Sequence, residues 1–472
     1  MKYFKIFSLF ILIALMATSC KKALDINTDP LVATSADPNA VLPFVFVQYS
    51  NRHTSELGTR MMDVPQHIAQ CFNSPKAGAT GSTITGNTWG MYYTQVLGNL
   101  ALVEIDALAG GAGNNNIAAI AKIFKAKSFF ELSSIWGDIP FTQALDGVQF
   151  PTPTFDTQED VFRGVITILD EAITLIDAMP ADVADVSTGD LIYNGDMDNW
   201  RRWANSLKLR VLMMLRNKDT SVDTEISKVL SEPMIEDNSQ AALIRYADNS
   251  GEANSWQRLI TNFFGGRNEE AGVYSPSAVS FDLLNQNDDP RFALMISDPN
   301  GNGPADIGLA TFGAPGSTAH ISNNVVRNDM PHNMFLPSEI SFYRAELALL
   351  GVSSDDAQAE FEKGVRQICE YWGGAIPNAT ATIASADIDN FITNLGAVDL
   401  QKVHEQLYLE SFFRPVIAWN TVRRTKVPTM LPVPGSSITT ILKRFNYPPD
   451  EVSSNSNTPA NAPTDTPMWF EN

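Results

Sequence analysis

The stretch WRRWANSLKLRVLMM, residues 200–214, predicts an amphipathic helix and, with it, a helical fold. Its apolar side chains recur every three or four positions, which places them on one face of a helix. They are Trp200, Trp203, Ala204, Leu207, Val211 and Met214. Asp198 or Asn199 stands before this run and carries the kind of side chain that caps a helix N-terminus.

Four further segments show the same period, so the chain is predicted to be mainly α-helical. They cover residues 117–135, 161–176, 361–372 and 401–419. Thr157 before Asp160 is typical of a helix start for the second of these segments, and Gly137 followed by Pro140 is typical of an end for the first.

Three segments lack a regular period and are predicted to be irregular. They are residues 74–88, rich in Gly, Ser and Thr; residues 247–330, rich in Gly, Asn, Asp and Pro; and the Pro-rich tail from Pro428. Long loops in a folded protein often carry function. The chain has no evident fixed repeat and no clean internal boundary, so residues 43–472 are predicted to form a single domain.

The composition is that of a folded globular protein with an acidic surface. Of the 472 residues, 44% are hydrophobic and 18% are charged, and the formal net charge is −20. Such a charge repels phosphate backbones, so no nucleic-acid partner is expected, and a polyanionic ligand is disfavoured. Apart from Cys20, the chain contains only Cys71 and Cys369, which predicts two buried thiols rather than a disulfide framework.

The N-terminus predicts export and attachment to a membrane. A basic start leads into the apolar run from Ile6 to Met16, which the small residues 17–19 close. This is the pattern of a signal peptide, predicted over residues 1–19, and the run is too short to span a bilayer. Cys20 directly after it resembles the lipobox cysteine of bacterial lipoproteins, which is the site of lipidation. Residues 20–42 are polar and are predicted to form a lipid-anchored tether.

No enzyme signature stands out, so no catalytic residue, cofactor or metal site is predicted. The five histidines lack metal-ligand spacing, and no nucleophile, phosphate-loop or dinucleotide motif occurs. Residues 298–306 resemble the start of a calcium loop, with oxygen-bearing Asp298, Asn300 and Asn302 before Gly303. Leu309 replaces the closing carboxylate of such a loop, so a plain turn is the favoured interpretation.

Aromatic and polar residues of the irregular segments are the candidate ligand-binding residues. A flat apolar ring beside amide or guanidinium donors suits a sugar, which has C–H faces and a rim of hydroxyls. The candidates are Asn73, Trp89, Trp256, Phe263, Arg267 and Tyr274. The alternative is that these rings anchor loops to the core, and for Trp89, one helical turn from Tyr92, this alternative is favoured.

An ordered set of short motifs gives the chain a family resemblance. The motifs are NTDP (27–30), WGDIPF (136–141), FDTQE (155–159), YNGD (193–196), ANSLKLR (204–210), NDDPR (287–291), YRAE (343–346), WN (419–420) and RRT (423–425). In this order the chain resembles the SusD/RagB-like outer-membrane lipoproteins of Bacteroidetes. The resemblance implies an all-α fold of tetratricopeptide-like helix pairs, with irregular loops that carry the ligand surface.

The resemblance also implies a function that involves no chemistry. Such a protein captures a glycan at the cell surface and passes it to a SusC-like TonB-dependent transporter of the outer membrane. Lys21 and Lys22 leave open which face of that membrane carries the lipid. Two alternatives remain: a lipoprotein of the same architecture that captures peptides, and a lipid-anchored glycoside hydrolase.

Overall fold

The computed structural model describes residues 37–69, 78, 80–249, 251–306, 317–375, 382–431, 433–438 and 440–471. Residues Pro38–Asn472 form one compact unit. The predicted signal peptide, Cys20, Cys71, Asn73 and most of the tether lie outside the described residues. The predicted end of the tether at residue 42 is wrong, because helix α2 already begins at Pro38. Proline suits the first turn of a helix, where its missing N–H has no partner to lose.

Long helices form the bulk of this unit. In the first half they are α2 (Pro38–Arg52), η1 (His53–Leu57), α3 (Gly58–Met61), α4 (Ser82–Gly90), η2 (Met91–Leu97), α5 (Gly98–Ala109), η3 (Ala112–Asn114), α6 (Asn115–Trp136), α7 (Gln158–Asp177), α8 (Met197–Arg216), η4 (Thr220–Val222), α9 (Asp223–Val229) and η5 (Asn238–Gln240). In the second half they are α10 (Ser255–Phe263), α11 (Asn268–Ala271), α12 (Ala278–Leu284), α13 (Arg291–Met295), α14 (Pro337–Leu349), α15 (Ala357–Glu370), η6 (Tyr371–Ala375), α16 (Ser385–Leu395), α17 (Leu400–Glu410), α18 (Pro415–Thr425) and α19 (Pro449–Ser454).

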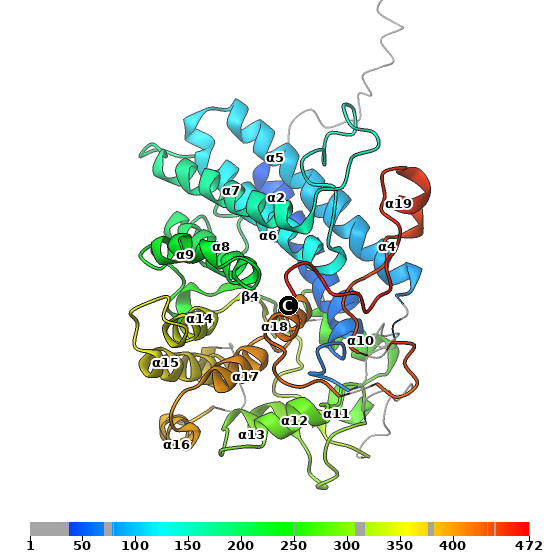
Figure 1. Ribbon diagram of the computed structural model, residues 1–472, viewed down its shortest axis with the longest axis vertical. Coiled ribbons are helices and arrows are strands. Elements are labelled where there is room, and N and C mark those ends of the chain that lie inside the picture. The colour runs from blue at the N-terminus through cyan, green and yellow to red at the C-terminus, as the bar shows by residue number, and fades with distance from the viewer. Residues whose placement is uncertain are drawn as a thin grey trace, which may run out of the picture. The chain divides into compact units, whose positions relative to one another are not determined.

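Consecutive long helices pack as pairs, and the pairs stack on one another. α5 packs on α6, α6 on α7, α7 on α8, and α14 on both α15 and α17. Figure 1 shows this stack running from α5–α7 past α8 and α9 to α14 and α15, while the short helices α10–α13 lie beside it. The predicted all-α scaffold of helix pairs is confirmed. No helix in the described part of the chain is both long and apolar enough to cross a membrane.

The strands are short and join distant parts of the chain. β1 (Ala242–Ile244) pairs antiparallel with β4 (His332–Phe335), and β2 (Ile296–Ser297) pairs antiparallel with β3 (His320–Ile321). Ile244 lies opposite His332, and Ile296 opposite Ile321. These ladders fix the segment that carries α10–α13 to the segment that leads into α14.

The predicted helix boundaries are partly confirmed. Thr157 caps α7 by accepting a hydrogen bond from the Asp160 amide, as expected. The cap of α8 is Asp196 rather than Asp198 or Asn199, because its carboxylate accepts the amides of both those residues. The single helix predicted over 401–419 is in fact α17 and α18. Phe413 between them has φ 66°, which a helix cannot contain, and Pro415 starts the second helix.

The predicted irregular segments contain more regular structure than their composition indicated. Residues 82–88 belong to α4, residues 247–330 include α10–α13 with β2 and β3, and the tail includes α19. These helices are too short to show a clear hydrophobic period, which is why the sequence pattern missed them.

A buried ion network fastens the stacked helices together. Arg210 of α8 donates two hydrogen bonds to the Glu339 carboxylate of α14, at 2.6 and 2.7 Å, and Arg414 reaches the same carboxylate at 2.9 Å. Burial alone would raise the pKa of Glu339, but the two guanidinium groups outweigh it and hold the pKa well below its usual value. The Glu339 carboxylate therefore joins three parts of the scaffold through paired charges.

Candidate functional site

A pocket of 360 Å³ lies where α10 packs against η1 and α3. We call it the phenylalanine pocket, and it is lined by Ser55, Glu56, Thr59, Arg60, Leu259, Phe263 and Phe264. Its volume lies at the lower end of the range of small-ligand sites, roughly 300–1,000 Å³. The lining comes from two segments about 200 positions apart in the sequence, which the fold brings together.

One wall of the pocket is built on a π-helical turn. η1 interrupts the helix that starts as α2, and a wider turn of this kind is frequent at functional sites. Glu56 on η1 pairs with Arg60 of α3 at 2.9 Å, and its carboxylate also accepts a hydrogen bond of 2.6 Å from Asn87 of α4. The polar groups on this wall are thus held in fixed positions before any ligand arrives.

The opposite wall presents two aromatic rings to solvent. Phe263, the last residue of α10, is 76% exposed, and Phe264 is 38% exposed. Gly265 and Gly266 follow with φ of 72° and 74°, a left-handed conformation that glycine adopts without strain. The chain turns away there and leaves the Phe263 ring largely exposed. A flat ring of this kind can pack on the C–H face of a sugar.

Trp256 supports the pocket from behind and does not line it. Its indole is fully buried, in edge contact with Tyr274 and Phe413 at centroid distances of 4.9 and 5.1 Å. A Cβ atom on Gly58 would lie 2.6 Å from the indole, so only glycine allows η1 and α3 to approach α10 this closely. Trp256 therefore fixes the distance between the two walls.

The prediction that Trp256 and Tyr274 stack on a ligand is corrected by their burial. Both rings are 0% exposed and anchor the segment to the core, which is the alternative considered from sequence. Residue type does not distinguish a ring that anchors a loop from one that stacks on a ligand, so the sequence could not separate these two roles.

The prediction that Trp89 contacts a ligand is corrected in the same way. It is 8% exposed and packs against other aromatic rings, those of Tyr93, Trp136, Phe155 and Tyr447. The Arg267 guanidinium donates to the Asn323 carbonyl at 2.6 Å and braces the chain after the two glycines, without lining the pocket. Of the candidates in the described residues, the structure places only Phe263 in the pocket.

Several pocket residues were missed by sequence reasoning. Glu56 and Arg60 are four positions apart, as in any helical ion pair, and carry no distinguishing signal. Phe264 beside Phe263, directly before two glycines, was the one visible sign of uncovered aromatic surface.

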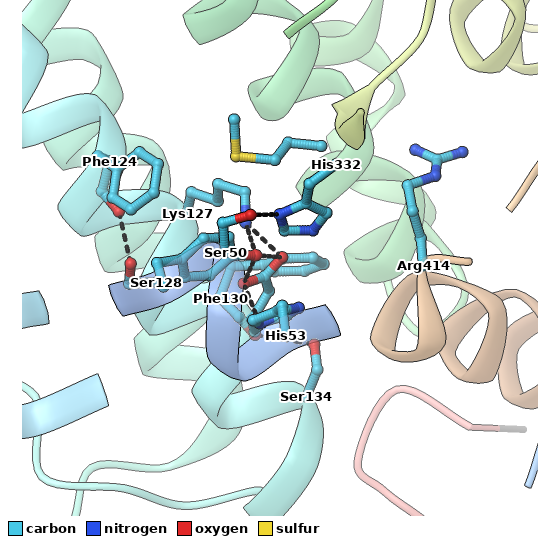
Figure 2. Close-up of polar contacts among 12 residues, drawn as sticks. Ser50, His53, Phe124, Lys127, Ser128, Phe130, Ser134, His332 and Arg414 are labelled. Atoms are coloured by element: carbon cyan, nitrogen blue, oxygen red, sulfur yellow. Dashed lines mark hydrogen bonds and ion pairs between the residues drawn. The ribbon is translucent and has the colours of Figure 1, made fainter. Parts of the chain in front are cut away.

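A second cluster of titratable groups is buried where α2, α6 and β4 meet (Figure 2). Lys127 pairs with Glu131 at 2.6 Å, and Tyr49 donates to the same carboxylate at 2.9 Å. His332 Nδ1 lies 2.8 Å from the Ser50 hydroxyl, and Figure 2 shows Ser50, Lys127 and His332 converging. These contacts join α2, α6 and β4.

Burial controls the protonation of this cluster. It lowers the pKa of Lys127 to about 8 against the opposing effect of Glu131, and it lowers the pKa of His53 and His332 well below the usual value. The adjoining cavity measures only 10 Å³, room for about one water molecule. The cluster therefore holds helices together and has no space for a substrate.

The segment considered for calcium forms a turn. Both carboxylate oxygens of Asp298 accept backbone hydrogen bonds, from Asn302 at 2.8 Å and from Gly303 at 2.9 Å. Leu309 lies outside the described residues. Within the residues that are described, no group of three or more metal-binding side chains is gathered.

The fold and the pocket define a helical scaffold protein with a pocket at its side. A family model, SusD-like, described as "Starch-binding associating with outer membrane", matches residues 33–448. The chain therefore belongs to the SusD-like family, and the predicted SusD/RagB-like resemblance is confirmed.

Solved structures with the same fold agree with this assignment. One is a chitin-binding protein, 22% identical, with a TM-score of 0.78 and coverage of 92% of this chain and 100% of that one. A SusD/RagB family protein from Bacteroides thetaiotaomicron is 20% identical, with a TM-score of 0.77 and coverage of 92% and 99%. A SusD homologue from Parabacteroides distasonis is 19% identical, with a TM-score of 0.74 and coverage of 92% and 97%. Among curated proteins, no match was found.

Proposed function

We propose that this protein binds a glycan in the phenylalanine pocket, without catalysis, and delivers it to a SusC-like TonB-dependent transporter in the outer membrane. The observation that carries the proposal is the exposed ring of Phe263 opposite the fixed Glu56–Arg60 pair. An apolar face and a row of hydrogen-bonding groups on opposite walls match the two kinds of surface of a sugar.

The family supports the glycan part of this proposal. Its model describes starch-binding proteins that associate with the outer membrane, and one structural relative is a chitin-binding protein. Within the described lining of the pocket, Glu56 is the only carboxylate. Glycoside hydrolases ordinarily place two carboxylates across the scissile bond, so this pocket is better suited to binding than to hydrolysis.

Calorimetry of the mature protein against a panel of oligosaccharides and short peptides tests the ligand class. We expect at least one oligosaccharide to bind and to be recovered with no new reducing ends. Binding of peptides alone would replace the proposal with peptide capture. Release of reducing ends from a bound glycan would replace it with hydrolysis.

Anchoring is a separate part of the proposal and has its own test. We propose that Cys20 carries the lipid and that residues 20–37 tether the binding unit to the membrane. A Cys20→Ser protein should incorporate no labelled palmitate and should leave the outer-membrane fraction. Unchanged labelling would place the lipid elsewhere. Co-purification with a TonB-dependent barrel encoded beside this chain, and loss of glycan uptake when either is deleted, would test delivery.

A further inference from the structure

A second cavity, of 430 Å³, lies next to the phenylalanine pocket along α10, and we call the two pockets together the groove beside α10. We call the second cavity the arginine pocket, and its lining includes Val47, Leu191, Ile244, Arg245, Tyr246 and Arg258. Asn51 borders the arginine pocket and Ser55 borders the phenylalanine pocket, one helical turn apart and joined by a hydrogen bond of 2.5 Å. Arg258 and Leu259, neighbours on α10, likewise face one pocket each. An extended ligand can therefore cross from one pocket to the other.

The arginine pocket has an unusual charge for this protein. Arg245 is exposed and Arg258 is half-buried, and in the described part of the chain neither forms an ion pair with a carboxylate. Among the described residues, the guanidinium of Arg258 donates only to the Ser255 hydroxyl, at 2.8 Å. One carboxylate, Glu252, lines the cavity, and it accepts a hydrogen bond of 3.0 Å from Asn249. Two guanidinium groups without anionic partners are notable in a chain with a net charge of −20.

The Arg258 guanidinium is positioned by a side-chain contact, and Arg245 is positioned through its backbone. Arg258 lies on α10 and is held by the Ser255 hydroxyl, which in turn donates to Asn51 at 3.1 Å. Arg245 directly follows strand β1. Tyr246, the residue after Arg245, also lines the pocket, and its hydroxyl lies 2.5 Å from that of Ser50. Arg258 is thus held in place before a ligand arrives, which lowers the cost of ordering it, and the exposed Arg245 side chain extends from the end of a strand.

We infer that the arginine pocket binds the carboxylate of an acidic sugar, so that the glycan carries sparse uronic acid units on an otherwise neutral chain. Guanidinium groups bind carboxylates through paired, charge-assisted hydrogen bonds. The apolar side chains of Val47, Leu191 and Ile244 offer surface to the C–H face of the same sugar. The overall negative charge repels a densely charged polymer at longer range, so the acidic units must be few. The inference rests on the proposed glycan binding and specifies its ligand.

The direct test compares D-glucuronate with its methyl ester, which differs only at the carboxylate. Low-affinity calorimetry at matched ionic strength, with sodium acetate as a second control, measures the arginine pocket without requiring the correct glycan backbone. We expect the acid to bind about tenfold more tightly than the ester, and Arg245→Gln with Arg258→Gln to remove the difference. Arg366→Gln, which removes one positive charge on α15 outside the lining of this pocket, should keep it.

Three results with the wild type would overturn the inference: equal binding of acid and ester, no binding of glucuronate at all, or acetate binding as tightly as glucuronate. A preference for the acid that persists in the double variant would place the carboxylate elsewhere and would also overturn it. The inference of an acidic ligand can fail while the proposed glycan binding stands. A neutral oligosaccharide that binds the wild type and the double variant equally would preserve glycan binding while removing the acidic ligand.

Discussion

The helix stack and the groove beside α10 differ in how far their charged and aromatic side chains are buried and paired. In the stack, charged groups such as Arg210 and Glu339 are buried and paired, and the rings of Trp200 and Trp203 are fully covered. In the groove, Phe263 is largely exposed and Arg245 has no acidic partner among the described residues. The buried contacts of the stack therefore stabilise the fold, whereas the exposed side chains of the groove remain available to contact a ligand. Mutations should separate the two regions clearly.

The largest effect is expected from breaking the buried network of the stack. Arg210→Leu leaves the Glu339 carboxylate with only part of its compensation, and the loss of one partner of a buried pair costs ~3–5 kcal/mol of unfolding free energy. Urea unfolding followed by circular dichroism measures this cost. A loss below ~1 kcal/mol would show that the network contributes no more than a surface pair.

A pH effect should follow from His67, which joins the groove side to the stack. Burial, with a smaller contribution from Arg414, lowers its pKa to about 3, although its hydrogen bond to the Tyr408 carbonyl opposes the shift. The unfolded chain binds this proton near pH 6.5 and the folded chain does not. Stability from His67 is therefore fully present above pH 6.5 and is lost as the pH falls toward 3, by ~1.4 kcal/mol per pH unit.

His67→Gln tests this dependence, because glutamine can still donate to the Tyr408 carbonyl but does not titrate. Denaturant unfolding between pH 6 and pH 4 should show a slope reduced by ~1.4 kcal/mol per pH unit relative to the wild type. An unchanged slope would mean that His67 is protonated in the folded protein.

The smallest effect on stability is expected at an exposed ion pair of the stack. Arg366 and Asp389 lie 2.5 Å apart, with side chains 38% and 59% exposed. Arg366→Gln should change the free energy of unfolding by less than ~1 kcal/mol, and 0.5 M salt should remove most of the difference. A loss comparable to that of Arg210→Leu would contradict the division between buried and surface charges.

The stack was readable from the sequence because long amphipathic helices leave a strong period. Residues 200–214 and 161–176 were placed correctly, with Thr157 as a cap. The break between α17 and α18 was hidden, because the left-handed conformation of Phe413 has no signature in its residue type. The family resemblance supplied the arrangement of the helices, which period alone does not determine.

The groove was far less predictable. Its two walls are distant in the sequence, and its polar groups look like ordinary helix-surface residues. Trp256 and Phe263 were equally plausible as stacking rings, and only tertiary packing showed that the first is buried against Gly58 and the second is exposed. Composition indicated the segment, but the side chains that face a ligand depend on the three-dimensional contacts.

The central claim is that the phenylalanine pocket binds the ligand, and Phe263→Ala tests it most directly. Because the ring is 76% exposed, its removal should leave the melting temperature nearly unchanged. Calorimetry with an oligosaccharide that binds the wild type should show an affinity lower by ~1–2 kcal/mol, roughly tenfold. Ile105→Ala, at a position 63% exposed on α5, should bind as the wild type does. Equal affinity of the wild type and Phe263→Ala would contradict the account.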